Sequence, residues 1–273
     1  MGNLFRAFFF KLRKDITFRV TLIVGAAVAV LMMLIFLMID YAIDIGVKTC
    51  TGQTLFLVSF TPTSNFGLAI PVNLITFTVL EFSNGVIRNK IVVGNSKFKI
   101  YLGLFLSGLV FALLLLLTYA GLCTLLGTIC GGFDPNGVAM GSIGAGEGSA
   151  GYATPQFIGY TLLIAILVYV SITAFTVFVS TLLRNVGPSI PLTLLPLILL
   201  AIIGPIVYQF VPEARDALIF LNPLQVLGNP TADSTGHMYF TNKQLIGTVV
   251  CNLMYTGIFF GFGTLIFIKR DVK

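Results

Sequence analysis

The sequence is poor in charged residues. Only 10% of its 273 residues are Asp, Glu, Lys or Arg, and its mean hydropathy is +1.00. A soluble globular domain usually carries charge on about a quarter of its residues. Such a low value argues against an ordinary soluble domain and is typical of a protein that lies within a membrane.

The sequence also lacks the groups that intramembrane chemistry needs. Its long apolar stretches contain no Asp, Glu, Lys, Arg or His, whereas proton- and ion-coupled carriers keep an ionisable group there. No HExxH or GxSxG motif occurs, and no lysine follows a glycine run as in a P-loop. The glycines at 146, 148 and 151 match GxGxxG without the expected strand and helix. We therefore expect no catalytic residue, metal or cofactor on this chain.

Cysteine is scarce, and none of the four cysteines forms a CxxC pair. Cys123 and Cys251 lie inside apolar stretches, where a small buried thiol is expected. Cys50 and Cys130 both fall near the predicted outer face, so either a disulfide or two free thiols is compatible with the sequence.

Long apolar stretches are abundant. Five of them are uncharged and long enough to cross about 30 Å of hydrocarbon as helices. A sixth is shorter and contains Pro71 and Asn73, but the charge distribution requires it. The predicted fold is an all-α integral membrane protein with six transmembrane helices. The predicted spans are 20–39, 66–82, 100–130, 157–183, 188–211 and 245–268.

The basic residues divide unevenly between the two predicted sides. With both termini in the cytoplasm, thirteen of the sixteen Lys and Arg residues lie inside, and seven of the ten acids lie outside. An excess of Lys and Arg in cytoplasmic segments is the usual orientation signal, so the pI near 9.2 does not indicate nucleic-acid binding. The bases face an anionic inner leaflet instead.

Three further segments have recognisable patterns. Residues 3–19 carry an apolar stripe opposite basic residues, which predicts an amphipathic helix in the membrane interface. The outer segment 131–156 is so rich in glycine that we expect no regular element in it. In the outer segment 213–228, Asn222-Pro223 divides an apolar stretch, which favours either two short re-entrant helices or one plain interfacial helix.

The most informative segment is 81–100, "EFSNGVIRNKIVVGNSKFKI", which places four bases and Glu81 between two apolar stretches. Residues 82–93 predict a short cytoplasmic helix. Apolar residues occur on two of its sides, so we expect it to contact its own spans and another protein. Glu81 ends the second span, where its carboxylate can accept bonds from backbone donors or pair with a nearby base.

Residues 81–110 resemble the signature region of ATP-binding-cassette (ABC) exporter permeases of the type-2 class. The matching features are Glu81, Gly85, the pair Ile87-Arg88, and Gly94-Asn95-Ser96 before Lys97. Lys97 stands where the family often has Arg. The interfacial helix, six spans and re-entrant helices between spans five and six also fit that family's layout.

The resemblance implies that this segment is a coupling helix docked on a separate ATPase. The residues it implicates in coupling are Glu81, Gly85, Val86, Ile87, Arg88, Ile91 and Gly94. It further implies two ATPase subunits that bind ATP and Mg²⁺ and a second permease chain, identical or homologous. The implied location is a plasma membrane, and a bacterial one is favoured. The expected cargo is amphipathic, such as an antimicrobial peptide, drug or lipid, which would give antibiotic resistance. A non-transporting membrane sensor or interaction subunit is the alternative.

Overall fold

The computed structural model describes residues 6, 10–11, 14–42, 48–60, 68–134, 138–140, 150–210, 227, 231–232 and 237–270. These residues form eight α-helices and two short antiparallel ladders, β1–β2 and β3–β4. The helices are α2 (Ile16–Ala42), α3 (Gly52–Ser59), α4 (Ala69–Ser83), α5 (Val86–Val92), α6 (Lys97–Gly131), α7 (Pro155–Leu183), α8 (Val186–Phe210) and α10 (Asn242–Lys269). The strands are β1 (Val138–Met140), β2 (Ala150–Tyr152), β3 (Thr231–Ala232) and β4 (Met238–Tyr239).

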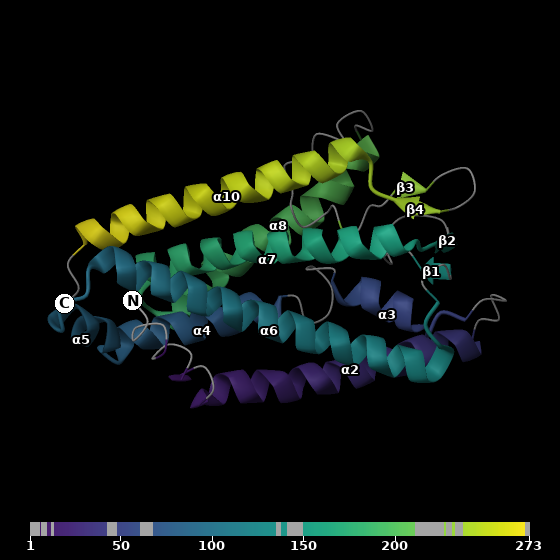
Figure 1. The fold of residues 1–273 in the computed structure, drawn as a ribbon, viewed down its shortest axis with the longest axis horizontal. Helices are drawn as coiled ribbons and strands as arrows, with labels where there is room; N and C mark the ends of the chain where they lie inside the picture. Colours follow the sequence, from purple (N-terminus) through teal and green to yellow (C-terminus); the bar gives the residue numbers. More distant parts are fainter. Residues whose placement is uncertain are drawn as a thin grey trace.

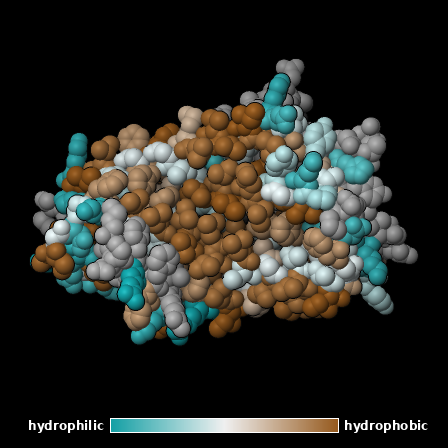
Figure 2. Space-filling model, viewed as in Figure 1, coloured by the Kyte–Doolittle hydropathy of each residue, from teal (hydrophilic) through white to brown (hydrophobic). Residues whose placement is uncertain are grey.

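The long helices lie side by side in an elongated bundle (Figure 1). The short helix α5 lies at one end of the bundle, and α3 and the four strands lie toward the other. Figure 2 shows a broad apolar belt around the middle of the visible face, with hydrophilic side chains toward both ends. This distribution matches hydrocarbon around the middle of the helices and water at their ends.

Within the described part of the chain, five helices are long and apolar enough to cross a membrane: α2, α6, α7, α8 and α10. Their ends lie within a few residues of the predicted spans, so the prediction of an all-α membrane protein is confirmed at this level. The predicted second span, 66–82, corresponds to the 15-residue helix α4. At 1.5 Å per residue α4 is about 22 Å long. It reaches the length of a membrane span only together with α5, and the two helices are bent by 52° relative to each other.

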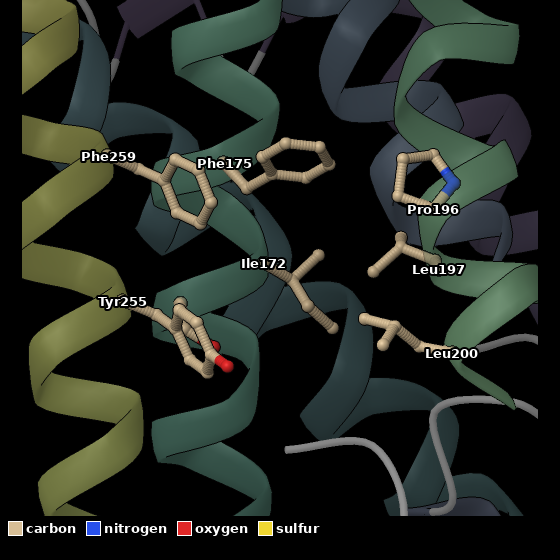
Figure 3. A pocket seen from close by; sticks show the side chains of 8 residues that line it. Ile172, Phe175, Pro196, Leu197, Leu200, Tyr255 and Phe259 are labelled. Atoms are coloured by element: carbon tan, nitrogen blue, oxygen red, sulfur yellow. The ribbon is translucent and has the colours of Figure 1, made fainter. Parts of the chain in front are cut away.

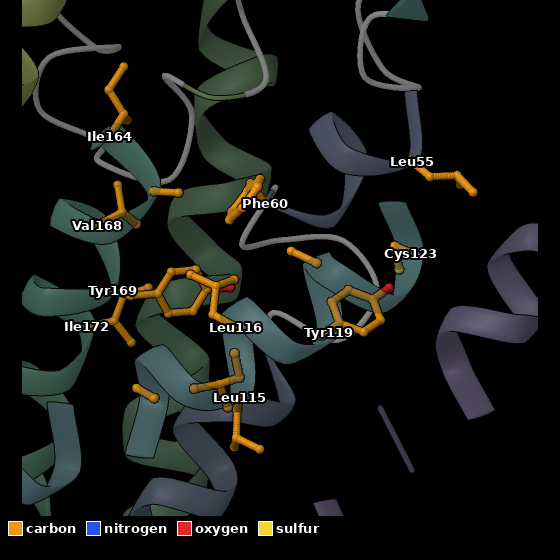
Figure 4. Packing of buried hydrophobic residues seen from close by; sticks show 14 of the residues in the cluster. Leu55, Phe60, Leu115, Leu116, Tyr119, Cys123, Ile164, Val168, Tyr169 and Ile172 are labelled. Carbon is orange, nitrogen blue, oxygen red and sulfur yellow. The ribbon is translucent and has the colours of Figure 1, made fainter. Parts of the chain in front are cut away.

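The core of the bundle lies around α6 and α7, which are the most buried of the five long helices. Leu115, Leu116 and Tyr119 of α6 pack with Val168, Tyr169 and Ile172 of α7 in one apolar cluster (Figure 4). Hydroxyl groups on α7 donate to carbonyl oxygens of the same helix, as Thr173 does to Tyr169 and Thr176 to Ile172. Polar residues therefore enter this core without leaving those donors unpaired.

The helix α3 lies between the first two predicted spans, 20–39 and 66–82. Thr51 caps α3, and α3 packs closely against the end of α6. Asp40 of α2 accepts hydrogen bonds from the Thr49 and Cys50 backbone N–H groups at 2.6 and 2.8 Å, which fixes the chain entering α3. An eight-residue helix with a polar first turn has too little apolar periodicity to be recognised in the sequence.

Two glycines of α6 permit this close packing. A methyl group added at Gly127 would lie 2.7 Å from the Thr51 carbonyl oxygen, and one at Gly131 would overlap the Cys50 carbonyl group. Small residues at i and i+4 are a common means by which membrane helices let another backbone approach. The helices α3 and α6 are therefore in contact through backbone atoms. A change of side-chain rotamer could not make room for a methyl group added there.

We predict that Gly127→Ala and Gly131→Ala each destabilise the protein by about 1–3 kcal/mol, because the added methyl group overpacks a backbone contact. Gly121→Ala on the same helix is the matched control, since a methyl group there meets no atom within 4 Å. Thermal denaturation in detergent, followed by size-exclusion chromatography, would measure the difference. Equal midpoints for Gly131→Ala and Gly121→Ala would contradict this account of the contact.

The four cysteines are free thiols in this structure, and Cys50 and Cys123 are buried. Burial, followed by the neighbouring Cys130, raises the pKa of the Cys50 thiol to about 12. Cys50 should therefore react slowly with thiol reagents near neutral pH.

The remaining sequence predictions have mixed outcomes. In the glycine-rich outer segment the prediction of no regular element was wrong in part, because β1 and β2 form an antiparallel ladder that pairs Ala139 with Gly151. In the predicted interfacial helix 3–19, the described residues Arg6, Phe10, Lys11 and Lys14 are helical, whereas 16–19 already belong to α2, which begins at Ile16; residues 3–5, 7–9 and 12–13 lie outside the described residues. The predicted re-entrant helices in 213–228 also lie outside them, apart from Leu227.

Candidate coupling site

The segment predicted to couple to an ATPase folds as a sharp corner at one end of the bundle (Figure 1). The helix α4 ends at Ser83, and Gly85 then adopts the left-handed conformation with φ of 66°. A residue with a side chain would be strained in this conformation by about 1–2 kcal/mol. No neighbouring atom lies within 4 Å of where a Gly85 side chain would begin. The glycine is therefore explained by the turn itself rather than by the close approach of another group.

The Gly94-Asn95-Ser96 sequence forms the second corner of the segment. Gly94 is left-handed, with φ of 91°, and it follows the end of α5. The Ser96 hydroxyl accepts a hydrogen bond from the Lys99 N–H at 3.4 Å and caps the start of α6. The Gly-x-Ser pattern thus has a local cause: glycine permits the turn and serine begins the next helix.

A buried carboxylate joins three parts of the chain at this site. The Glu81 side chain is 1% exposed at the end of α4. Its Oε1 accepts a hydrogen bond from Lys11 Nζ at 2.7 Å, and its Oε2 accepts one from Lys90 Nζ at 2.8 Å. Lys11 also lies over the Phe77 ring, 4.4 Å from its centre. The second expectation for Glu81, pairing with a nearby base, is therefore confirmed, and it has two such partners.

We call Glu81, Lys11 and Lys90 the Glu81 clamp. Lys90 belongs to α5 and Lys11 to the N-terminal segment, so one carboxylate holds both elements against α4. Each carboxylate oxygen has its own ammonium partner, which compensates for part of the cost of burying the charge. The sequence contained no signal for Lys11, because it lies 70 positions from Glu81 and is one of several bases near the N-terminus.

Apolar contacts hold the other side of α5 on the bundle. Ile87 is fully buried in a cluster with Ile100, Tyr101 and Leu104 of α6. Two more members of this cluster, Val177 and Phe267, come from α7 and α10, and Ile91 packs against it from outside. One isoleucine of the short helix thus contacts a cluster that three long helices build.

This arrangement corrects the role that we expected for Ile87. The sequence suggested that Val86, Ile87 and Ile91 supply the apolar area for a partner. Ile87 instead is completely covered by its own chain, and Val86 and Ile91 are only partly exposed. The apolar side chains left open are Val92, 78% exposed, and Val93, 80% exposed. Beside them, Arg88 and Asn89 are exposed on α5. We call these four residues the open face of α5.

The other bases near this end have separate positions. Lys97 Nζ donates to the carbonyl oxygens of Ile268 and Arg270, at 2.9 and 3.4 Å. A cation at these carbonyl groups is favourable because the C-terminal end of a helix carries partial negative charge. Lys99 is exposed. Lys97 therefore joins the start of α6 to the end of α10, while Lys99 is free to face lipid headgroups.

The Glu81 clamp and the cluster around Ile87 together join α5 to α4, α6, α7 and α10. Among the residues that the structure describes, no group of three or more His, Cys, Asp or Glu residues could hold a metal ion. The buried Glu81 carboxylate is occupied by two lysines. Comparisons with protein-family models and with curated protein sequences found no match.

Proposed function

We propose that this chain is the transmembrane permease subunit of an ATP-driven ABC exporter of the type-2 class. The proposal rests on the geometry of α5. Ile87 and Lys90 fix this short helix to its own bundle, whereas its open face stays exposed at the end of the molecule. Such a helix can transmit displacement from a partner to the spans. ATP and Mg²⁺ would be bound by the partner ATPase, and two copies of each subunit would form the exporter.

In this proposal α4 is the second of six spans, and α5 is a cytoplasmic coupling helix rather than the continuation of α4. The bend of 52° between them and the left-handed Gly85 support that division. The uneven distribution of Lys and Arg supports placing both termini and α5 in the cytoplasm of a plasma membrane. The absence of ionisable residues from the long apolar stretches favours an amphipathic cargo over a small ion.

Single-cysteine labelling tests the orientation. In a cysteine-free background, we expect an impermeant maleimide to label Tyr239→Cys in intact cells, because Tyr239 is exposed at the end with the strands. Asn95→Cys, which follows α5, should react only after the cells are permeabilised. Labelling of Asn95→Cys in intact cells would overturn the proposed topology.

The docking role predicts different effects for two exposed bases. We expect Arg88→Glu to insert and fold normally but to lose the bound ATPase, because the substitution reverses charge on the open face of α5. Lys99→Glu is the matched control, since Lys99 is equally exposed but lies beyond the corner, on α6. Tagged protein would be purified in mild detergent and assayed for Mg²⁺-dependent ATP hydrolysis. Absence of ATPase activity with the unsubstituted chain would favour a sensor or interaction subunit instead.

A further inference from the structure

A groove runs along the surface of α7 between α8 and α10. Its cavity volume is about 140 Å³. Ile172 and Phe175 of α7 form the floor (Figure 3). Leu197 and Leu200 of α8 form one wall, and Tyr255 and Phe259 of α10 form the other. The two walls are separate because α8 packs on α4 and α7, whereas α10 packs on α6 and α7.

The surface that the groove offers to a ligand is almost entirely hydrocarbon, and Tyr255 in the α10 wall carries a hydroxyl. Phe175 and Phe259 contact each other across the floor and one wall, with ring centres 4.9 Å apart. Ser171 also borders the groove, but its hydroxyl is hydrogen-bonded to the Val168 carbonyl oxygen and to Asn252 Oδ1, both at 2.8 Å. Its polar group is thus already satisfied within the protein. Dispersion contacts with an apolar ligand are the main interaction left available here.

The exposed side chains at the edges of the groove indicate which environment the groove opens into. Leu200 and the adjacent Leu199 on α8 are 40% and 45% exposed, and Ile258 beside Phe259 on α10 is 44% exposed. Both helices are long and apolar enough to span the membrane. Side chains of this kind on the outside of membrane spans face lipid tails, so the groove opens toward hydrocarbon and not toward water.

We propose that this groove binds one acyl chain of a membrane phospholipid. An engineered cavity of about 150 Å³, lined by similar residues, stays free of water and binds benzene, so a site of this size holds a short length of hydrocarbon. In a lipid bilayer, an acyl chain that enters the groove fills space that is otherwise empty. It gains contacts with α7, α8 and α10. The inference depends on the membrane location of α7, α8 and α10 and is independent of the proposed transport function.

The absence of tryptophan from the chain makes the proposal directly testable. Single tryptophans would be placed at Phe175 in the floor, at Ile258 on the rim and at Phe111, which is fully buried in α6. The full-length variants would be reconstituted into vesicles of phosphatidylcholine brominated along its acyl chains, which quench tryptophan fluorescence on contact. Phe259→Trp serves as a second groove reporter if Phe175→Trp does not fold.

We expect Phe175→Trp to be quenched nearly as strongly as Ile258→Trp and several times more than Phe111→Trp. Adding Leu200→Phe, which narrows the groove, should lower quenching of Phe175→Trp and leave Ile258→Trp unchanged. Quenching of both groove reporters at the level of Phe111→Trp would overturn the proposal. If that low quenching rises on dilution into excess lipid, a second copy of the chain covers the groove and lipid does not.

Discussion

Ile87→Asp is expected to prevent stable folding of the chain. Removing the buried isoleucine side chain alone should cost about 2–5 kcal/mol. The new carboxylate would lie in a cluster built from apolar and aromatic side chains of α6, α7 and α10, none of which can pair with a charge. An unpaired charge in such surroundings adds a further large penalty. The variant should therefore aggregate or be degraded rather than accumulate in the membrane.

Val93→Asp is the matched control, because it introduces the same carboxylate at a position that is 80% exposed next to α5. We expect it to reach the membrane at the level of the unsubstituted chain. Chromatography of fluorescent fusions in detergent would distinguish the two outcomes. If Ile87→Asp gave the same monodisperse peak as Val93→Asp, α5 would not be packed on its own spans as described.

The consequence for the proposed function is practical. Loss of an ATPase from Ile87→Asp would report misfolding and would say nothing about docking. Only substitutions on the open face of α5, such as Arg88→Glu, can test the contact with a partner. The sequence pattern alone pointed to Ile87 as a docking residue, whereas the structure buries Ile87 and leaves its neighbours Arg88, Val92 and Val93 exposed.

The second large effect is expected at the Glu81 clamp. Glu81→Ala should destabilise the protein by about 3–5 kcal/mol, because it leaves lysines without their partner in a buried site. Lys90 bears most of this cost, since its side chain is 15% exposed, compared with 32% for Lys11. Lys11 can turn toward water more easily. Thermal denaturation in detergent, with Lys99→Ala as the exposed control, would measure the loss.

The double variant Glu81→Leu with Lys90→Leu tests whether the loss of stability comes from the lysine charge left without Glu81 or from the change of side chain itself. Replacing both members of a buried pair by apolar residues often costs little. We expect the double variant to be more stable than Glu81→Leu alone. If it were less stable, by the sum of the two single losses, the pair would not interact and the clamp would be wrong.

The sequence predicted the long helices well because a membrane imposes a simple rule on them. Uncharged stretches such as 100–130 and 157–183 correspond closely to α6 and α7. The same rule contains no information on α3, which is short and begins with polar residues. The sequence predicted one short helix over 82–93, whereas the structure has a left-handed Gly85 between α4 and α5 and a left-handed Gly94 after α5.

The candidate site was only partly predictable for a different reason. Residues 81–97 are contiguous, so their spacing alone revealed the segment. Which side of α5 faces the bundle depends on residues far away in the chain, namely Tyr101, Val177 and Phe267. The pairing of Lys11 with Glu81 is likewise a contact between distant segments. With apolar residues on two sides of one short helix, periodicity did not determine which side would be buried.

Ile87 brings the short helix α5 into contact with three much longer helices. The helix α5 has seven residues and is therefore about 10 Å long, while α6, with 35 residues, is about 52 Å long. Ile87 bears on a cluster shared by α6, α7 and α10, but α2 and α8 contribute no residue to that cluster among those described. In the proposed exporter, a push on α5 would therefore act on α6, α7 and α10 together.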